Sequence, residues 1–225
     1  PKLMRRLLLR HVRKELGPGV DMRHFSPRYS PWDGRLCILP QYDLLHAVRD
    51  GQASVVTDTI ERFTRNGIRL ASGNELDADI IVSATGFNLR VFGGMRVTVD
   101  GVPCNPNERM TYKGVLIDGV PNLAVIFGYI NFSWTAKVDI AGEYLCRLLA
   151  HLESTGAHVV IPRNTDAKAT GASIMNALNS GYVARGADEL PRQGDRAPWY
   201  VHHNIREDRR WLLRDPVDDG VLEFR

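Results

Sequence analysis

The sequence predicts an α/β protein. Strand candidates separated by turn signals lead into a short apolar run at residues 79–84, and a second apolar run at 123–129 leads into a long helical segment. Short apolar runs bounded by turn residues are typical of strands that are buried on both faces. The pattern contains no complete strand–helix–strand unit.

The composition is that of an ordinary globular protein. The chain has 225 residues, enough for one domain or two small ones. A hydrophobic fraction of 44% and a charged fraction of 24% argue against wholesale disorder. The three cysteines include no CxxC pair, which argues against a disulfide scaffold and a zinc ribbon, and a reducing cytoplasm is the expected compartment. The sequence contains no run of about 18 apolar residues, so no transmembrane helix is expected.

The first expected element is a basic helix over residues 2–16. Met4, Leu8, Val12 and Leu16 recur every four residues. Residues 1–16 hold six bases and one acid, whereas the rest of the chain is slightly acidic, so a nucleic-acid-binding face is not expected. The helix could contact a membrane surface or a partner, or it could be an arginine-rich surface helix packed on the body. The narrow apolar stripe favours the second interpretation.

Several short elements are expected next. Residues 43–49 suggest a short helix, and residues 53–57, 60–64 and 67–70 are strand candidates. Asn66-Gly67 between the last two candidates is a strong hairpin signal. Residues 97–99, followed by Asp-Gly, indicate another hairpin.

A long helix is predicted at about 134–153. Asn131 or Ser133 can cap its N-terminus, and Gly156 follows its end. Cys146 is expected to be a small core residue. Residues 162–181 are expected to form a loop with one weak helix. The predicted apolar face of the long helix consists of Val138, Ala141, Leu145, Leu148, Leu149 and Leu152.

The usual signatures of catalysis are absent from the sequence. There is no GxGxxG at a strand-to-helix turn, no P-loop, no HExxH and no GxSxG. His202-His203 is a poor chelating pair, so no metal site is expected. Two positions remain of interest: Gly86, which follows the first apolar run, and the N-terminus of the long helix, where ligands of open α/β sheets commonly bind.

A family resemblance is carried by residues 77–87 (DADIIVSATGF). This segment resembles the D-x-I-V-x-A-T-G-[FY] segment of flavin-containing and Baeyer–Villiger monooxygenases. Further segments resemble the ethionamide-activating branch of the actinobacterial Baeyer–Villiger enzymes. These segments are residues 31–37, 54–58, 112–114, 128–135, 188–194 and 197–199. The segments in this order form a specific resemblance that covers essentially the whole chain.

The resemblance implies an incomplete fold of two dinucleotide-binding domains (FAD/NAD(P)-binding, Rossmann-like), with a hairpin meander and a C-terminal extension. Residues 1–86 would be the C-terminal part of the NADPH-binding domain and residues 87–160 that of the FAD-binding domain. Residues 161–225 would form the extension. An intact member uses FAD and NADPH to insert one oxygen of O₂ next to a ketone carbonyl, or to oxidise sulfur or nitrogen. The implied substrate is a ketone, a sulfide or a thioamide.

The resemblance also implies roles for individual residues. Arg35 matches an active-site arginine that holds the nicotinamide and stabilises negative charge developing at the flavin, as a fixed guanidinium in a dry site can do. Thr85 and Gly86 would lie near the junction of the cofactor domains. The residues expected to border the flavin ring are Asn131, Ser133 and Trp134.

The sequence departs from the family pattern in its glycine-rich loops. The family's N-terminal GxGxxG, which holds the FAD pyrophosphate, is missing, as are FxGxxxHxxxWP and the NADPH loop. We therefore expect the C-terminal portion of a monooxygenase, inactive without its N-terminal half, and proline at position 1 agrees with a truncated reading frame. The alternative is a non-catalytic remnant or an interaction subunit that needs an N-terminal partner chain. The expected location is cytoplasmic, with peripheral membrane contact through residues 2–16 as an open alternative.

Overall fold

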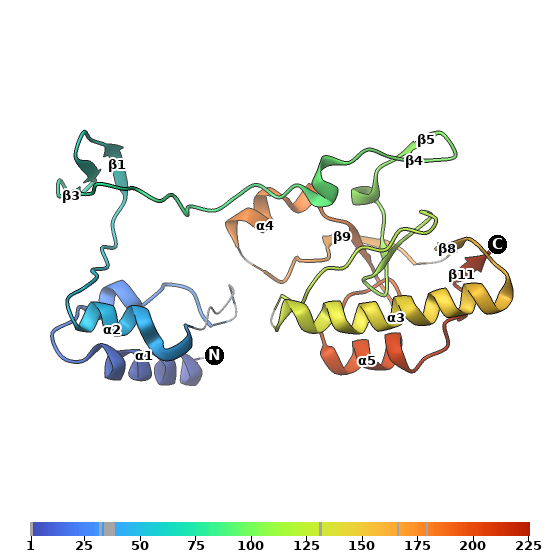
Figure 1. Ribbon diagram of the computed structural model, residues 1–225, viewed down its shortest axis with the longest axis horizontal. Coiled ribbons are helices and arrows are strands. Elements are labelled where there is room, and N and C mark those ends of the chain that lie inside the picture. Colours follow the sequence, from blue (N-terminus) through green and yellow to red (C-terminus); the bar gives the residue numbers. More distant parts are fainter. Residues whose placement is uncertain (1, 32, 34–38, 131, 166, 179) are drawn as a thin grey trace. The chain divides into compact units, whose positions relative to one another are not determined.

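The chain contains both helices and short strands in the computed structural model, which describes residues 2–31, 33, 39–130, 132–165, 167–178 and 180–225 (Figure 1). This content agrees with the α/β class. Contacts divide the chain into two units, Pro1–Gly86 and Phe87–Arg225. The assignment of residues 1–86, 87–160 and 161–225 to parts of cofactor domains stays a prediction.

Two helices form one part of the first unit. The predicted helices are confirmed as α1 (Lys2–Leu16) and α2 (Asp43–Arg49), which pack against each other. Leu16 and Leu45 are buried. Two basic residues, Arg13 and Lys14, lie in the last turn of α1, where they stabilise the negative end of the helix dipole.

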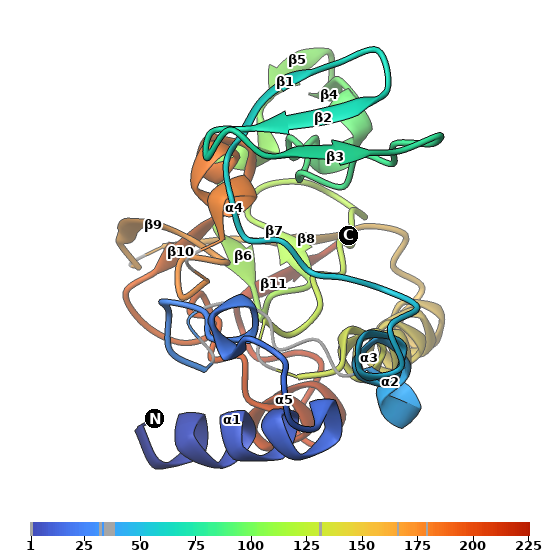
Figure 2. The same ribbon diagram turned by 90° about the vertical axis from the view of Figure 1, so that its left-hand side faces the viewer.

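A three-stranded antiparallel sheet forms the other part of the first unit. Its strands are β1 (Ile60–Phe63), β2 (Gly67–Leu70) and β3 (Glu75–Asp77), with β2 in the middle (Figure 2). The predicted hairpin at Asn66-Gly67 is confirmed. A Cβ atom at Gly67 would overlap the backbone of Leu76, so the close approach of β3 requires glycine there. The strand predicted at residues 53–57 is wrong, because no described segment forms a ladder with it.

The apolar run at residues 79–84 does not form the expected buried strand. It is extended and exposed, with Ile80 82% and Val82 84% accessible. A strand that is apolar on both faces needs neighbouring strands and covering layers. No described segment of the chain pairs with this run.

The second unit is built around α3 (Trp134–Thr155), which packs on α5 (Ile205–Leu213) (Figure 1). The predicted helix is confirmed, and Gly156 ends it with a φ of 70°. The side chains of α3 that the core buries are Lys137, Ile140, Ala141, Tyr144 and Leu148.

The predicted apolar face of α3 is partly wrong. Val138 and Leu149 are exposed, Leu149 by 64%. Cys146, expected in the core, is also exposed. The helix carries apolar side chains over more than one face, and periodicity alone does not decide which of them the core buries.

The rest of the second unit consists of short antiparallel pairs. These are β4 (Val97–Val99) with β5 (Val102–Cys104), β6 (Thr111–Tyr112) with β7 (Leu116–Ile117), β8 (Val160–Pro162) with β11 (Leu222–Phe224), and β9 (Ala169–Ser173) with β10 (Arg192–Gly194). A short helix, α4 (Gly181–Arg185), precedes β10. Short 3₁₀ helices occur in both units. They lie at Met22–Phe25 and Pro40–Tyr42 in the first unit, and at Val91–Gly94, Pro106–Glu108 and Ala187–Glu189 in the second.

The expected hairpin, loop and strand of the second unit differ in how well they agree with the structure. The hairpin at residues 97–99 is confirmed. The loop expected at 162–181 contains β9, and the strand expected at 123–129 is reduced to a single bridge between Leu116 and Ala124. Every named strand pair among the described residues is antiparallel, so the Rossmann-like sheet stays a prediction. None of the described helices combines the length and apolar character needed to cross a membrane.

Candidate functional site

Thr85 and Gly86 lie at the end of the first unit, directly after the exposed run at 79–84. Gly86 has a φ of 110°, a conformation that glycine adopts far more easily than other residues. The Thr85 hydroxyl lies 3.4 Å from the Ser83 hydroxyl. This geometry agrees with a turn after the run, whereas the roles proposed for these two residues stay predictions. Arg35 lies outside the described residues, and its role also stays a prediction.

Ser133 and Trp134 lie together at the start of α3. Ser133 is the N-cap residue, and its hydroxyl is 2.7 Å from the Thr135 hydroxyl rather than bonded to a backbone N–H of the first turn. The N-terminus of a long helix carries about half a positive charge and free N–H groups. This end of α3 can therefore face an electron-rich or anionic group. Asn131 lies outside the described residues.

The Trp134 ring lies against the backbone at Gly128. A Cβ atom at Gly128 would overlap the indole around Cδ2, where its two rings are fused, so glycine is required for this packing. Trp134 is nevertheless 40% exposed. Since one side of the indole has a fixed support, the accessible part can present a flat surface to a planar ligand.

Two further exposed apolar side chains lie close to Trp134 in the sequence. Phe132 is 57% exposed, and Val138, one turn further along α3, is also exposed. The Phe132 ring meets the buried Tyr129 ring edge to face, with 6.3 Å between centroids. Exposed aromatic and aliphatic side chains on neighbouring residues are typical of a binding surface.

A buried ion pair involves Lys137, which follows Trp134 by three residues on α3. Lys137 Nζ is 2.9 Å from Asp208 Oδ2, and the two side chains are 3% and 6% exposed. The Lys137 ammonium also lies 5.7 Å from the centre of the Tyr129 ring. Burial lowers the pKa of Lys137, and the Asp208 carboxylate opposes that shift. Burial raises the pKa of the Tyr129 hydroxyl, and the negative charge of the Asp208 carboxylate acts in the same direction.

Sequence reasoning missed this ion pair. A signal for Lys137 was present, because it lies three and four residues before Ile140 and Ala141 on the packed face of the helix. A charged residue at a core position indicates a buried partner. No comparable local signal identified Asp208, which lies in the charged C-terminal tail.

A second ion pair, in which only the lysine is buried, joins the β6–β7 turn to the tail. Lys113 Nζ is 3.1 Å from Asp219 Oδ2, and the Tyr112 hydroxyl donates a hydrogen bond of 2.6 Å to the same oxygen. Lys113 and Gly114 have φ values of 51° and 67°, as a tight hairpin turn requires. Burial raises the pKa of Tyr144, whose ring faces the Lys113 ammonium, to about 12.

His203 gives a pH dependence that can be tested. Its Nε2 atom lies 2.6 Å from the Ile174 carbonyl oxygen, and burial lowers its pKa below 6.5. Between the folded pKa and 6.5 the unfolded chain binds a proton that the folded chain does not. The contribution of His203 to the free energy of unfolding is therefore fully present above about pH 6.5, and it is lost progressively as the pH falls below that value.

Urea titrations from about pH 7 to about pH 5 should show a falling midpoint, and His203→Gln should reduce this slope. His158→Gln, at an exposed histidine, is the matched control and should leave the slope as in the parent chain. An unchanged slope in His203→Gln would show that His203 does not titrate as described.

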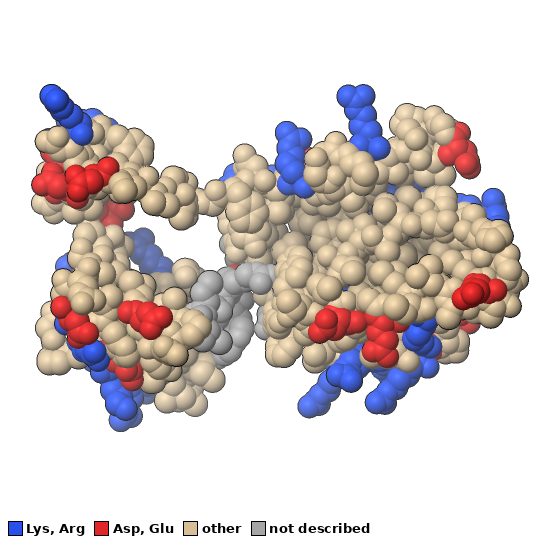
Figure 3. Space-filling view, in the orientation of Figure 1, with Lys and Arg blue, Asp and Glu red and all other residues tan. Residues whose placement is uncertain are grey.

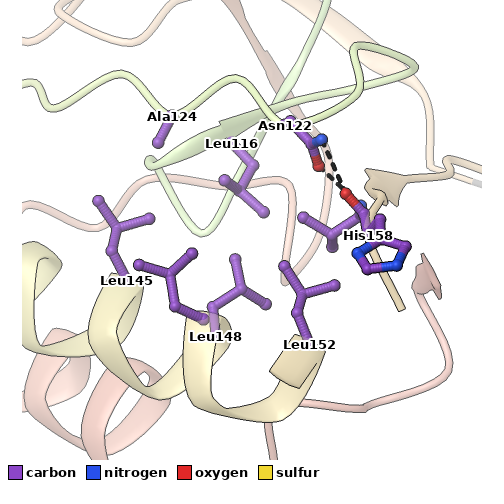
Figure 4. Close-up of a pocket in the computed structure, with 9 residues that line it drawn as sticks. Leu116, Asn122, Ala124, Leu145, Leu148, Leu152 and His158 are labelled. Atoms are coloured by element: carbon purple, nitrogen blue, oxygen red, sulfur yellow. Dashed lines mark hydrogen bonds between the residues drawn. The ribbon is translucent and has the colours of Figure 1, made fainter. Parts of the chain in front are cut away.

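An apolar pocket of about 330 Å³ lies further along α3 (Figure 4). Leucine side chains from α3 form one wall, and Asn122 Nδ2 donates a hydrogen bond of 3.1 Å to the His158 carbonyl oxygen at its rim. The pocket lining includes no carboxylate or ammonium group and is mostly aliphatic, with Asn122 and His158 as its polar residues. Its lining residues on α3 are Leu145, Leu148, Leu149 and Leu152.

Charged side chains are distributed over both units. In the face drawn in Figure 3, Lys and Arg are interspersed with Asp and Glu on each unit. Among the residues that the structure describes, no group of three or more His, Cys, Asp or Glu side chains could hold a metal ion.

Comparison with known proteins gives the family relationship. No family model matches the chain. MymA of Mycobacterium tuberculosis (strain H37Rv), named as an FAD-containing monooxygenase, is 55% identical over 224 residues, which is 100% of this chain and 45% of MymA. The chain matches the C-terminal portion of FAD-containing monooxygenases.

Two further relatives are similar to this chain along its whole length and are also named as monooxygenases. AlmA of an Acinetobacter species, named as an FAD-binding monooxygenase, is 50% identical over the whole chain and 45% of its own length. The FAD-containing monooxygenase EthA of M. tuberculosis (strain H37Rv) is 45% identical over 225 residues and 46% of its length. The resemblance inferred from residues 77–87 is thus confirmed for FAD-containing monooxygenases. The chain spans less than half the length of these relatives.

Proposed function

We propose that this chain is the C-terminal part of an FAD- and NADPH-dependent monooxygenase of Baeyer–Villiger type. The observation that carries the proposal is the 45–55% identity to named FAD-containing and FAD-binding monooxygenases along the entire chain. Bound FAD would supply the oxygen-activating chemistry. The proposed substrate is a ketone, a sulfide or a thioamide.

The residues at the start of α3 fit one part of the cofactor. The Trp134 indole on Gly128 provides a supported flat surface, and the N–H groups that follow Ser133 provide a positive helix end. Both would favour an electron-rich planar ring. Asn131 would complete the border, Thr85 and Gly86 would lie near the junction of the cofactor domains, and Arg35 would hold the nicotinamide. The diphosphate is not accommodated in the same way, because the sequence contains no GxGxxG loop.

Complementation tests the proposed function. The chain should be coexpressed with the portion of MymA that precedes the matched region, and FAD content and NADPH consumption should be measured with a panel of ketones, sulfides and thioamides. We expect the pair to retain FAD and to consume NADPH in response to one substrate class. The chain purified by itself should be colourless, because it lacks the loop that holds the FAD diphosphate.

Two outcomes contradict different parts of this proposal. Stoichiometric FAD in the chain alone would show that the diphosphate is held by residues present here. A pair that retains FAD but consumes no NADPH with any substrate class would contradict the Baeyer–Villiger assignment.

A second candidate function is that of a non-catalytic interaction subunit for an N-terminal partner chain. The exposed run at 79–84 favours it, as do Leu149 and the pocket on α3, because unpaired strands and uncovered apolar faces associate readily. In the same experiment, a stable complex without FAD and without NADPH consumption would support this function over the first.

Membrane contact through residues 2–16 stays a separate prediction. Leu8, Leu9 and Val12 are half-buried, and Leu16 is fully buried, which is the behaviour of a packed surface helix. The apolar side chains of α1 that remain exposed are Leu3, Met4 and Leu7.

A further inference from the structure

A buried lysine at the second turn of α3 needs an explanation. Lys137 is among the most deeply buried charged groups described, and lysine is rarely buried unless it is paired. It follows Ser133 and Trp134 by four and three residues, so the three residues share one end of the helix. Its acidic partner, Asp208, belongs to α5 in the C-terminal tail.

Tyr129 connects this pair to the segment that precedes the helix. The ring of Tyr129 is 1% exposed and lies 5.7 Å from Lys137 Nζ. The same ring contacts Phe132, and the residue before Tyr129 is Gly128, whose backbone supports the Trp134 indole. Tyr129 and the Lys137–Asp208 pair therefore connect the residues that pack on Phe132 and Trp134 to α5.

We infer that Lys137 and Asp208 are positioning residues that set the orientation of Trp134 and of the first turn of α3 from the C-terminal tail. Neither residue needs to touch a cofactor. The significance of this orientation for catalysis rests on the proposed function, because only there does Trp134 face the flavin. The orientation itself is a property of the present chain.

The second ion pair provides the comparison. Lys113 is also buried and also ties the tail to the core, although its partner Asp219 is 24% exposed, and the Lys113 ammonium faces Tyr144, two turns further along α3. If the ion pairs that tie the tail to the core served stability alone, neutralising either pair would have the same effect on Trp134.

The experiment uses the full chain and acrylamide quenching of Trp134 fluorescence. The signal of Trp134 is obtained by subtracting the spectrum of the same protein carrying Trp134→Phe. Two double variants are compared, Lys137→Met/Asp208→Asn and Lys113→Met/Asp219→Asn. Each removes both charges of a pair and keeps a side-chain oxygen at the position of the acid.

We expect the quenching constant of Trp134 to change by about twofold in the Lys137 variant and to stay unchanged in the Lys113 variant. An unchanged constant in the Lys137 variant, or equal changes in both variants, would overturn the inference. Far-UV circular dichroism and the urea midpoint establish that both variants are folded.

If the Lys137 variant does not fold, the comparison is made with Asp208→Glu and Asp219→Glu, which keep both charges and shift the carboxylate by one methylene. Quenching of Trp134 should then change in Asp208→Glu alone, and equal behaviour of the two variants would overturn the inference. The outcome is independent of the complementation assay. A complemented enzyme without FAD contradicts the proposed function, whereas unchanged quenching contradicts the positioning role even in an active enzyme.

Discussion

Gly128→Ala is expected to destabilise the second unit by about 1–3 kcal/mol and to displace the Trp134 indole. The added methyl group would overlap the ring, so either the indole or the backbone must move. Urea unfolding gives the loss of stability, and the emission maximum of Trp134 reports the displacement. The double variant Gly128→Ala/Trp134→Ala should lose less stability than the sum of the two single variants, because the overlap is then absent.

Gly142→Ala is the matched control on the same helix. A Cβ atom at Gly142 would meet no atom within 4 Å, and the residue lies inside α3. Alanine is favoured over glycine in a helix, so this variant should gain about 0.5–1 kcal/mol. Equal losses in the Gly128 and Gly142 variants would contradict the specific contact between Gly128 and Trp134.

Asp208→Asn is expected to destabilise the second unit by about 3–5 kcal/mol, because it leaves the Lys137 ammonium buried without its counter-charge. Adding Lys137→Met should recover most of this loss, since the second change removes the uncompensated charge. Chemical denaturation of the two variants and the parent chain measures both effects.

An exposed pair serves as the comparison for Asp208. Glu223 accepts hydrogen bonds from Arg163 and Arg225, and these side chains are a third or more accessible to solvent. Glu223→Gln should therefore cost less than about 1 kcal/mol. A loss from Asp208→Asn that is as small as this would show that Lys137 is solvated in the protein.

Features with a local cause could be predicted from the sequence. The helix at 43–49 and the hairpins at 67–70 and 97–99 depend on nearby turn residues and on periodicity within a few positions. The strands expected at 79–84 and 123–129 were wrong for a common reason. A strand forms only when its backbone is hydrogen-bonded to a neighbouring strand, and an apolar run in the sequence does not show whether such a neighbour is present.

In the candidate site, too, the local features could be predicted and the contacts between distant segments could not. The resemblance indicated Ser133 and Trp134, and the structure brings them together with Gly128 at the start of α3. It did not indicate Asp208, which lies 71 positions beyond Lys137 in the sequence, because that contact depends on the packing of α5 against α3. Predicting the contact would have required the arrangement of the tail.

The exposed run at residues 79–84 also affects how the protein must be made. An exposed segment of β-branched residues with an unpaired backbone can form a β-ladder with the same segment of another copy. Copies synthesised close together can therefore associate through this run before it pairs with a correct partner. Correct assembly and precipitation then compete from the moment of synthesis. A complementary polypeptide that is present during translation would favour correct assembly over precipitation.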